Sequence, residues 1–235
     1  MNRENMKRGQ KDGSGSVKIK AVILDYGDVL SYSPTAEEWG RMASLFHVDP
    51  AGFRPLWDRN RLHYDRGDFS LETYWSKLAA DAGMKLEPEQ LKQLSQWDVE
   101  MWAHINPTMV EWLKQMRSSG VKTGLLSNMP VDMIRYVRQQ FRWLDHFDHQ
   151  TFSAEVKLIK PDPAIYRHSL EGLRVSASEA LFVDDRETNI QGARSVGMLA
   201  IRFESTAQLG NDLEKLGFPV RPVASKSPSS TFLAG

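Results

Sequence analysis

The feature that most constrains the fold is a short apolar run that leads directly into an acidic turn at residues 20–31, KAVILDYGDVLS. The four consecutive apolar residues 21–24 are typical of a strand that is buried on both faces, in the middle of a parallel sheet. Asp25 therefore stands at the carboxyl end of a strand, where open parallel sheets place their active crevice. A carboxylate at this position is a candidate nucleophile or metal ligand, and a turn-capping role is the structural alternative.

Alternating strands and helices resume after residue 106, and this pattern predicts an α/β fold. Repeated strand–helix units connect through right-handed crossovers, so we expect a three-layer, Rossmann-like core with a parallel sheet. The further strands are predicted at residues 121–126, 150–152, 180–183 and 198–203, and the helices at residues 107–118, 131–140, 162–171, 188–196 and 206–216.

The stretch between the first strand and residue 106 predicts an all-helical cap that is inserted into the core. It is rich in Trp, Leu, Met, Arg and Glu, and Thr35 with Glu38 forms the capping-box pattern of a helix start. We expect residues 64–70 to form a loop between two of its helices. The predicted organisation is a flexible tail at 1–18, the core at 19–31 and 106–218, the helical cap at 32–105, and a second flexible tail at 219–235.

The composition excludes several kinds of partner and site. Lys plus Arg and Asp plus Glu both number 30, so the formal net charge is zero and we expect neither nucleic acid nor a membrane surface as a partner. The absence of cysteine excludes disulfides, thiolate metal sites and a cysteine nucleophile. No apolar run approaches the ~20 residues of a membrane-spanning helix and no apolar signal core follows the N-terminus, so a cytoplasmic location is expected. The sequence predicts no oligomeric state.

Polar side chains gather where the predicted strands of the core end. Because the carboxyl ends of parallel strands meet at one edge of a sheet, we expect these side chains to lie together. Clustered carboxylates repel one another and need a counter-charge, which Mg²⁺ would supply, and a lysine, a hydroxyl and an amide suit a phosphate. This inventory fits phosphoryl transfer to a carboxylate in a small phosphorylated substrate. The residues are Asp25, Ser127, Asn128, Lys160, Asp184 and Asp185.

The order and spacing of these groups resemble the haloacid dehalogenase-like hydrolase superfamily. Its four motifs are similar to Asp25-Tyr-Gly-Asp28, to Ser127 after the second strand, to Lys160 in KPDPAIY, and to the acids in FVDDRETNIQGARSVGM, which begin at Asp184. The resemblance covers residues 20–203, and the helical insertion is similar to the inserted cap of that superfamily.

The resemblance implies a role for each residue. Asp25 would attack phosphorus and form an aspartyl-phosphate. Mg²⁺ would be held by Asp25, the backbone carbonyl of Gly27 and Asp185, with Asp184 as a close neighbour in the catalytic set. The transferring phosphoryl group would be bound by Ser127 and Lys160, with Asn128 helping to shape that pocket.

One position departs from the superfamily pattern. Most of its phosphatases carry a second Asp two residues after the nucleophile as general acid and base, and Gly27 stands there in this chain. In this respect the chain resembles bacterial phosphatases that act on glucose 1-phosphate, and its cap resembles the branch that includes the N-terminal phosphatase domain of soluble epoxide hydrolases. A positioned acid or base contributes about 10²–10⁴-fold, so a substitute is expected from Asp28, from the cap or from water.

Three functions are compatible with these residues. The first is a Mg²⁺-dependent phosphatase of a small phosphorylated metabolite, with a sugar phosphate as a candidate. The second is a 2-haloacid dehalogenase, whose metal-free chemistry also lacks the second Asp, although that branch loses the paired acids found here at Asp184 and Asp185. The third is a catalytically weak binding or regulatory protein that keeps the fold.

The cap residues are predicted to be mainly structural. We expect its tryptophans to form the cap's core, with one or two of them facing the substrate, and we expect its arginines near the site to be solvated charges. Asn189 is expected to hold the loop that follows the paired acids. The cap residues concerned are Trp39, Trp57, Trp75, Trp97 and Trp102, and Arg59, Arg61 and Arg66.

Overall fold

A computed structural model describes residues 18–223 of the chain, so most of the two predicted tails, 1–18 and 219–235, lies outside the described residues. Its centre is a five-stranded sheet with the order β3-β2-β1-β4-β5, in which every neighbouring pair is parallel. The central strand β1 is hydrogen-bonded on both sides and fully buried, as its apolar run predicts. The strands are β1 (Ala21–Leu24), β2 (Lys122–Ser127), β3 (His149–Phe152), β4 (Ala180–Asp184) and β5 (Leu199–Arg202).

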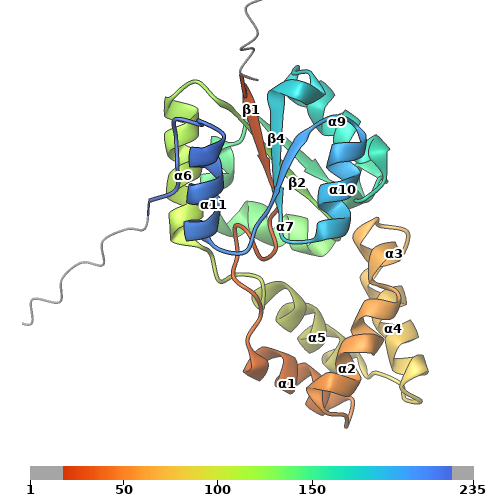
Figure 1. Ribbon diagram of the computed structural model, residues 1–235. Coiled ribbons are helices and arrows are strands. Elements are labelled where there is room, and N and C mark those ends of the chain that lie inside the picture. Colours follow the sequence, from red (N-terminus) through yellow and green to blue (C-terminus); the bar gives the residue numbers. More distant parts are fainter. Residues whose placement is uncertain (1–17, 224–235) are drawn as a thin grey trace, which may run out of the picture.

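Helices cover both faces of the sheet and complete the three predicted layers (Figure 1). Alternate residues of β1 point to opposite faces, so Val22 and Leu24 pack with one group of helices, and Ala21 and Ile23 pack with the other. The first group is α6 (Pro107–Ser118), α7 (Val131–Gln140) and α11 (Thr206–Lys215), and the second is α9 (Pro163–Leu173) and α10 (Glu187–Ser195). Short helical turns also occur at η1 (Arg142–His146), α8 (Ser153–Val156) and η2 (Ala177–Glu179).

Five of the six helices between the first and second strands lie to one side of the sheet and have a hydrophobic cluster of their own (Figure 1). We refer to them as the cap. The chain passes between the core and the cap twice, and the two passages are joined by the antiparallel bridge between Ser31 and Ile105. The cap helices are α1 (Ala36–Leu45), α2 (Pro50–Arg59), α3 (Arg61–Asp65), α4 (Leu71–Asp81) and α5 (Pro88–Glu100).

Local signals at the helix starts agree with the structure, with one exception. Thr35 and Glu38 form the predicted capping box, since the Thr35 backbone N–H donates to Glu38 and the Glu38 N–H donates to the Thr35 hydroxyl. The predicted loop at 64–70 is wrong in its first two residues, because Tyr64 and Asp65 belong to the short helix α3. An ion pair between Arg61 and Asp65, four residues apart, stabilises that single turn.

The chain stays attached to the core just beyond its last helix. The Trp112 side chain donates from Nε1 to the Val220 carbonyl at 2.9 Å, which ties the segment after α11 to α6. Within residues 18–223, no helix combines the length and the apolar character that crossing a membrane would require.

The cap's separate core leads to a stability prediction. Phe53 is fully buried, with ring centroids 5.2 Å from Phe46 and 6.3 Å from Trp39. Because Phe53→Ala leaves a cavity in this cluster, we expect the free energy of unfolding to fall by about 3–5 kcal/mol, measured by urea denaturation. Leu62→Ala is the matched control, because Leu62 is 56% exposed and should change the free energy by less than about 0.5 kcal/mol. Equal effects of the two changes would contradict a packed cap core.

Candidate active site

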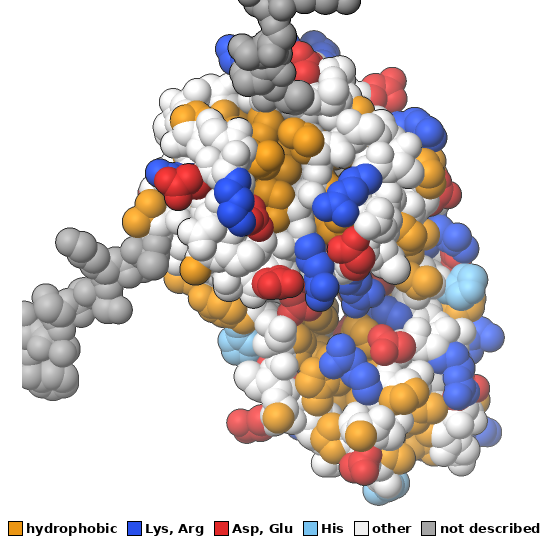
Figure 2. Space-filling view, viewed as in Figure 1, with side chains coloured by type: hydrophobic (Ala, Val, Ile, Leu, Met, Phe, Trp, Pro, Cys, Tyr) orange, Lys and Arg blue, Asp and Glu red, His pale blue; other side chains and the backbone are white. Residues whose placement is uncertain are grey.

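The carboxyl edge of the sheet forms the floor of a cavity of about 400 Å³ between the core and the cap. In Figure 2 a hollow opens between these two parts, with acidic and basic side chains around it and apolar side chains within it. Asp25, Ser127 and Asp184 stand at the ends of three adjacent strands, β1, β2 and β4. Of the core residues singled out in the sequence, those that line the cavity are Asp25, Gly27, Asp28, Ser127, Asn128, Lys160, Asp185 and Asn189.

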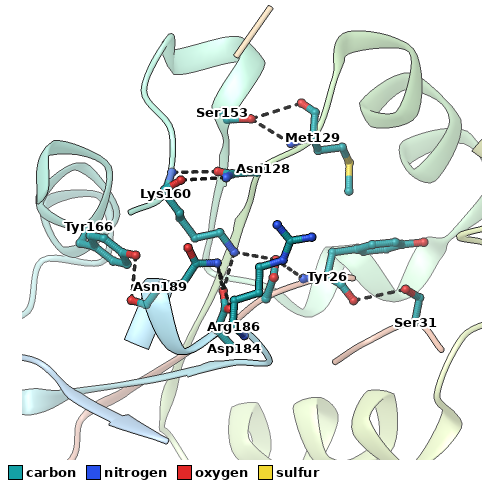
Figure 3. Close-up of polar contacts among 11 residues, drawn as sticks. Tyr26, Ser31, Asn128, Met129, Ser153, Lys160, Tyr166, Asp184, Arg186 and Asn189 are labelled. Carbon is teal, nitrogen blue, oxygen red and sulfur yellow. Dashed lines mark hydrogen bonds and ion pairs between the residues drawn. The ribbon is translucent and has the colours of Figure 1, made fainter. Parts of the chain in front are cut away.

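The Lys160 ammonium is the centre of the polar contacts at this edge (Figure 3). Its Nζ lies 2.8 Å from Asp25 Oδ1 and 2.7 Å from Asp184 Oδ2, and the lysine is only 2% exposed. A buried charge is tolerated where an opposite charge and hydrogen bonds replace water. One cation therefore holds the ends of β1 and β4 together and balances part of their negative charge.

Asp184 is completely engaged by the protein. Besides Lys160, its oxygens accept hydrogen bonds from the Asn189 side-chain amide at 2.9 and 3.0 Å and from the Arg186 backbone N–H at 2.9 Å. Burial by itself raises the pKa of Asp184, but Lys160 and these donors hold it below its usual range. Asp184 thus anchors Lys160, and Asn189 has the structural position expected for it.

Asp25 is only half engaged. Its Oδ1 accepts from Lys160 and, at 2.7 Å, from the Tyr26 backbone N–H, while Oδ2 accepts no hydrogen bond from any residue in the described part of the chain. Burial raises the pKa of Asp25 to about 7, against the effect of Lys160 and with the help of Asp184 and Asp185. The open oxygen is therefore the one available for a substrate or a cation.

The three carboxylates at this edge form an oxygen-rich site for a cation. Ligand atoms of Asp25, Asp184 and Asp185 all lie within 4.8 Å of one another. Burial, together with Asp184 and Asp28, raises the pKa of Asp185 to about 6. Since Asp184 is already paired, Asp25 and Asp185 are the carboxylates free to coordinate, and a hard cation that prefers oxygen ligands fits this donor set.

The structure brings Ser127 and Asn128 to the cavity wall in two different ways. The Asn128 amide pairs with the backbone of Lys160, donating to its carbonyl at 3.1 Å and accepting from its N–H at 2.9 Å. Asn128 therefore positions the lysine, a contact that the sequence did not reveal. The Ser127 hydroxyl makes no hydrogen bond with other residues of the described segment and lies at the cavity surface.

The Trp102 ring lies close to the position that a side chain at residue 27 would occupy. A Cβ atom built on Gly27 would lie 3.3 Å from the Trp102 ring, closer than an ordinary carbon–carbon contact. An aspartate at this position would therefore push against the ring. Asp28 has a backbone φ of 59°, and one of its carboxylate oxygens accepts a hydrogen bond from the Ser33 hydroxyl.

The cap's tryptophans lie as predicted. Trp39, Trp57 and Trp75 are buried in the cap cluster, and Trp97 and Trp102 pack against it. Two of them, Trp57 and Trp102, also line the cavity. The cap's hydrophobic core therefore extends to the wall that faces the carboxylates.

The expectation of three solvated arginines is wrong for one of them. Arg59 is exposed and Arg66 is partly exposed, but Arg61 is buried and lines the cavity. Its Nε donates to Asp65 at 2.8 Å and its Nη1 donates to both oxygens of Asp98 at 2.9 Å. Two carboxylates supply the counter-charge that makes burial of this guanidinium feasible, and the pairing across α3 and α5 is visible only in the fold.

Two residues of the site were not anticipated from the sequence. Arg186 lines the cavity directly after the paired acids, and in Figure 3 its side chain extends toward Tyr26; its place beside Asp185 was the only available signal. Ser153 accepts a hydrogen bond from the Met129 N–H at 2.8 Å and donates one to the Asp65 carbonyl, so it joins the cap to the core. Nothing in the sequence around Ser153 indicates this contact.

Comparison with known proteins identifies the family. A family model described as haloacid dehalogenase-like hydrolase matches residues 19–197. A sesquiterpene phosphatase of Aspergillus oryzae is 30% identical over 199 residues, which are 84% of this chain and 96% of that protein. The bifunctional epoxide hydrolase 2 of Sus scrofa is 31% identical over an alignment of 236 positions, which covers 90% of this chain but only 42% of that longer protein.

A solved structure shares the fold. A variant of a haloacid dehalogenase family enzyme from Bacteroides thetaiotaomicron, crystallised with magnesium and inorganic phosphate, superposes with a TM-score of 0.65. The alignment covers 79% of this chain and 94% of that one at 21% identity. At this identity the likeness is evidence for the fold alone.

The buried carboxylates lead to a prediction about stability and pH. Because the pKa of Asp25 is raised to about 7, the native state binds more protons than the unfolded chain between about pH 4 and pH 7. The contribution of Asp25 therefore lowers the free energy of unfolding as the pH rises through this range. In EDTA, Asp25→Asn should be more stable than the wild type at pH 8, by a few kcal/mol at most, and the difference should disappear at low pH.

Urea denaturation at pH 5 and pH 8 measures this difference. Asp58→Asn is the matched control, because it removes an exposed carboxylate at the same cavity and should leave the pH dependence unchanged. Identical pH profiles for the wild type and Asp25→Asn would contradict the raised pKa.

Proposed function

This chain belongs to the haloacid dehalogenase-like hydrolase family, and on that premise we propose that it is a Mg²⁺-dependent phosphatase that acts through an aspartyl-phosphate at Asp25. The substrate is a small phosphorylated metabolite that enters the cavity between core and cap. The observation that carries this proposal is the Lys160 bridge, which fixes Asp25 through Oδ1 and leaves Oδ2 open toward the cavity.

The charges around Asp25 suit a phosphoryl group. The Lys160 ammonium contacts the Asp25 carboxylate, so it is placed to bind an oxygen of the phosphoryl group that Asp25 attacks. The unpaired Ser127 hydroxyl at the end of β2 is a donor to a second oxygen. Asn128 acts through Lys160, because its side-chain amide is hydrogen-bonded to both the backbone carbonyl and the backbone N–H of that lysine.

The free donors at the floor fit Mg²⁺. Asp25, the Gly27 carbonyl and Asp185 are the groups that would hold it, while Asp184 remains paired with Lys160. The related enzyme from Bacteroides thetaiotaomicron was solved with magnesium and inorganic phosphate, which supports the assignment. The bound ion would offset the charge of the carboxylates and of the phosphate, so that the two can approach.

The apolar lining of the cavity favours a substrate whose organic group has a large apolar surface. Tyr26, Trp57, Trp102 and Met133 line the cavity, and a related chain is a sesquiterpene phosphatase. We therefore place a phosphate ester of an apolar alcohol ahead of the sugar phosphate considered from the sequence. Comparing kcat/KM for farnesyl phosphate and glucose 1-phosphate tests this order, and a preference for the sugar ester would reverse it.

The dehalogenase alternative is less well supported. Carbon-centred displacement of halide needs no metal, yet three carboxylates with a single buried lysine among them leave an excess of negative charge here. A cation explains this excess directly. Release of halide from 2-haloacids without metal would favour the dehalogenase.

The nucleophile assignment predicts a complete loss of activity. Asp25→Asn keeps the shape of the side chain but removes its negative charge, so we expect hydrolysis of para-nitrophenyl phosphate to fall to background. Circular dichroism should show an unchanged fold. Retention of more than about a tenth of the activity, a barrier change of about 1.4 kcal/mol or less, would remove Asp25 from this role.

The metal assignment predicts a dependence on Mg²⁺ that can be measured as binding and as activity. Activity should vanish in EDTA and return with Mg²⁺. Asp185→Ala should weaken Mg²⁺ binding in calorimetry by at least about 10–100-fold, the cost that loss of even an indirect partner typically has. Full hydrolysis of an aryl phosphate in EDTA would contradict the assignment.

A further inference from the structure

The proposed reaction needs a proton for the departing oxygen, and residue 27 cannot supply it. Gly27 has no side chain, and the Trp102 ring fills the space beside it. A loose phosphoryl-transfer transition state places much of the charge on the leaving oxygen, which matters most when the leaving alcohol is a weak acid. An alkyl phosphate therefore requires a proton donor elsewhere in the cavity.

The geometry of in-line attack restricts where this donor lies. The attacking and leaving oxygens stand on opposite sides of phosphorus. Asp25 attacks from the floor formed by the sheet edge, so the leaving oxygen faces the cap. Among the described residues, the cap carboxyl groups that line the cavity are Asp58 and Asp65. Asp58 is exposed to solvent, whereas Asp65 is only 8% exposed.

Asp65 is held in place and has one oxygen available. Arg61 Nε donates to its Oδ1 at 2.8 Å, while Oδ2 has no hydrogen-bond partner within residues 18–223. Its main-chain carbonyl accepts from Ser153, which in turn accepts from the Met129 N–H on the core. The position of Asp65 relative to the floor is therefore fixed by a direct contact between cap and core.

The surroundings of Asp65 raise its affinity for a proton. One guanidinium, Arg61, faces two buried carboxylates, and Asp98 takes the larger share of the donors, two contacts from Arg61 Nη1 and one from Trp57 at 3.0 Å. Burial raises the pKa of Asp65 to about 6, although Arg61 and Arg186 act in the opposite direction and Asp98 adds to the rise. The pKa of Asp65 is therefore closer to neutral pH than that of an ordinary carboxyl group, which suits general acid and base catalysis.

We propose that Asp65 is the general acid and base of this site, an assignment that rests on the proposed phosphatase function. In the first step an Asp25 oxygen forms a bond to phosphorus, the bond from phosphorus to the ester oxygen breaks, and that oxygen takes the proton of the Asp65 carboxyl group. In the second step water attacks phosphorus, gives a proton back to the Asp65 carboxylate, and the bond to Asp25 breaks. Phosphate leaves, and both aspartates return to their starting states.

Asp28 is the competing candidate and is less well placed. It lies on the floor beside Asp185, whose pKa it raises, and one of its oxygens is engaged by Ser33. It therefore stands on the same side of phosphorus as Asp25. The leaving oxygen faces away from it.

The test compares kcat/KM for two esters that differ in their need for a proton. If the wild type has a general acid, its kcat/KM for n-butyl phosphate should be only moderately lower than its kcat/KM for para-nitrophenyl phosphate. Asp65→Asn should lower kcat/KM for the butyl ester by at least about 100-fold and change that for the aryl ester by less than about threefold, because acid catalysis matters where the leaving group is poor. Asp58→Asn is the matched control, because Asp58 is the other cap carboxyl group that lines the cavity and it is exposed to solvent.

Each outcome decides between the alternatives. Equal losses on both esters for Asp65→Asn, or the same selective loss for Asp58→Asn or Asp28→Asn, would overturn the assignment. A wild-type kcat/KM that falls steeply from the aryl ester to the butyl ester would also overturn the assignment. This measurement needs no variant, so the proposal can be tested even if Asp65→Asn fails to fold. An inactive wild type on both esters with Mg²⁺ would refute the phosphatase function itself, which distinguishes the two failures.

Discussion

The ion pairs of one buried lysine hold the site together. Lys160 lies between Asp25 at the end of β1 and Asp184 at the end of β4. Asn128 at the end of β2 forms two hydrogen bonds with the Lys160 backbone. Removing the lysine is expected to be strongly destabilising, typically by about 3–5 kcal/mol, because Asp25 and Asp184 would stay buried without their counter-charge. Three adjacent strands therefore converge on a single lysine. Asp184 is fully paired, so among the described partners of this lysine the carboxylate oxygen that stays free at the cavity is Asp25 Oδ2.

The cap repeats the same arrangement on the opposite wall. There a buried guanidinium, Arg61, faces two carboxylates, as Lys160 does in the core. In each pair one carboxylate is fully satisfied and the other keeps an open oxygen: Asp184 and Asp25 on the floor, Asp98 and Asp65 on the cap. A substrate held between the two walls would meet one incompletely paired acid from each side. This arrangement suits a reaction in which one carboxylate is the nucleophile and the other is the general acid and base.

Much of the core was predictable because its signals are local. The run at 21–24 has no polar residue, so a strand buried on both faces was the simplest interpretation, and the polar residues after the strands had to meet once the sheet was parallel. The capping box at Thr35 is likewise a contact over three residues. The prediction of a loop at 64–70 was wrong in its first two residues because burial of an ion pair stabilises the turn that includes Asp65. No local sequence pattern marks a charged pair as buried.

The sequence by itself determined which chemical groups the site contains, since strand ends in a parallel sheet share an edge and Asp25, Ser127, Lys160 and the paired acids follow those ends. Only the tertiary structure decided what each group is free to do. Asp184 is fully paired while Asp25 is not, and Arg61 is buried rather than solvated. Contacts such as Ser153 with Asp65, 88 residues apart, arise from the packing of cap on core. Local propensities describe neighbours along the chain, and these contacts join residues that only the fold makes neighbours.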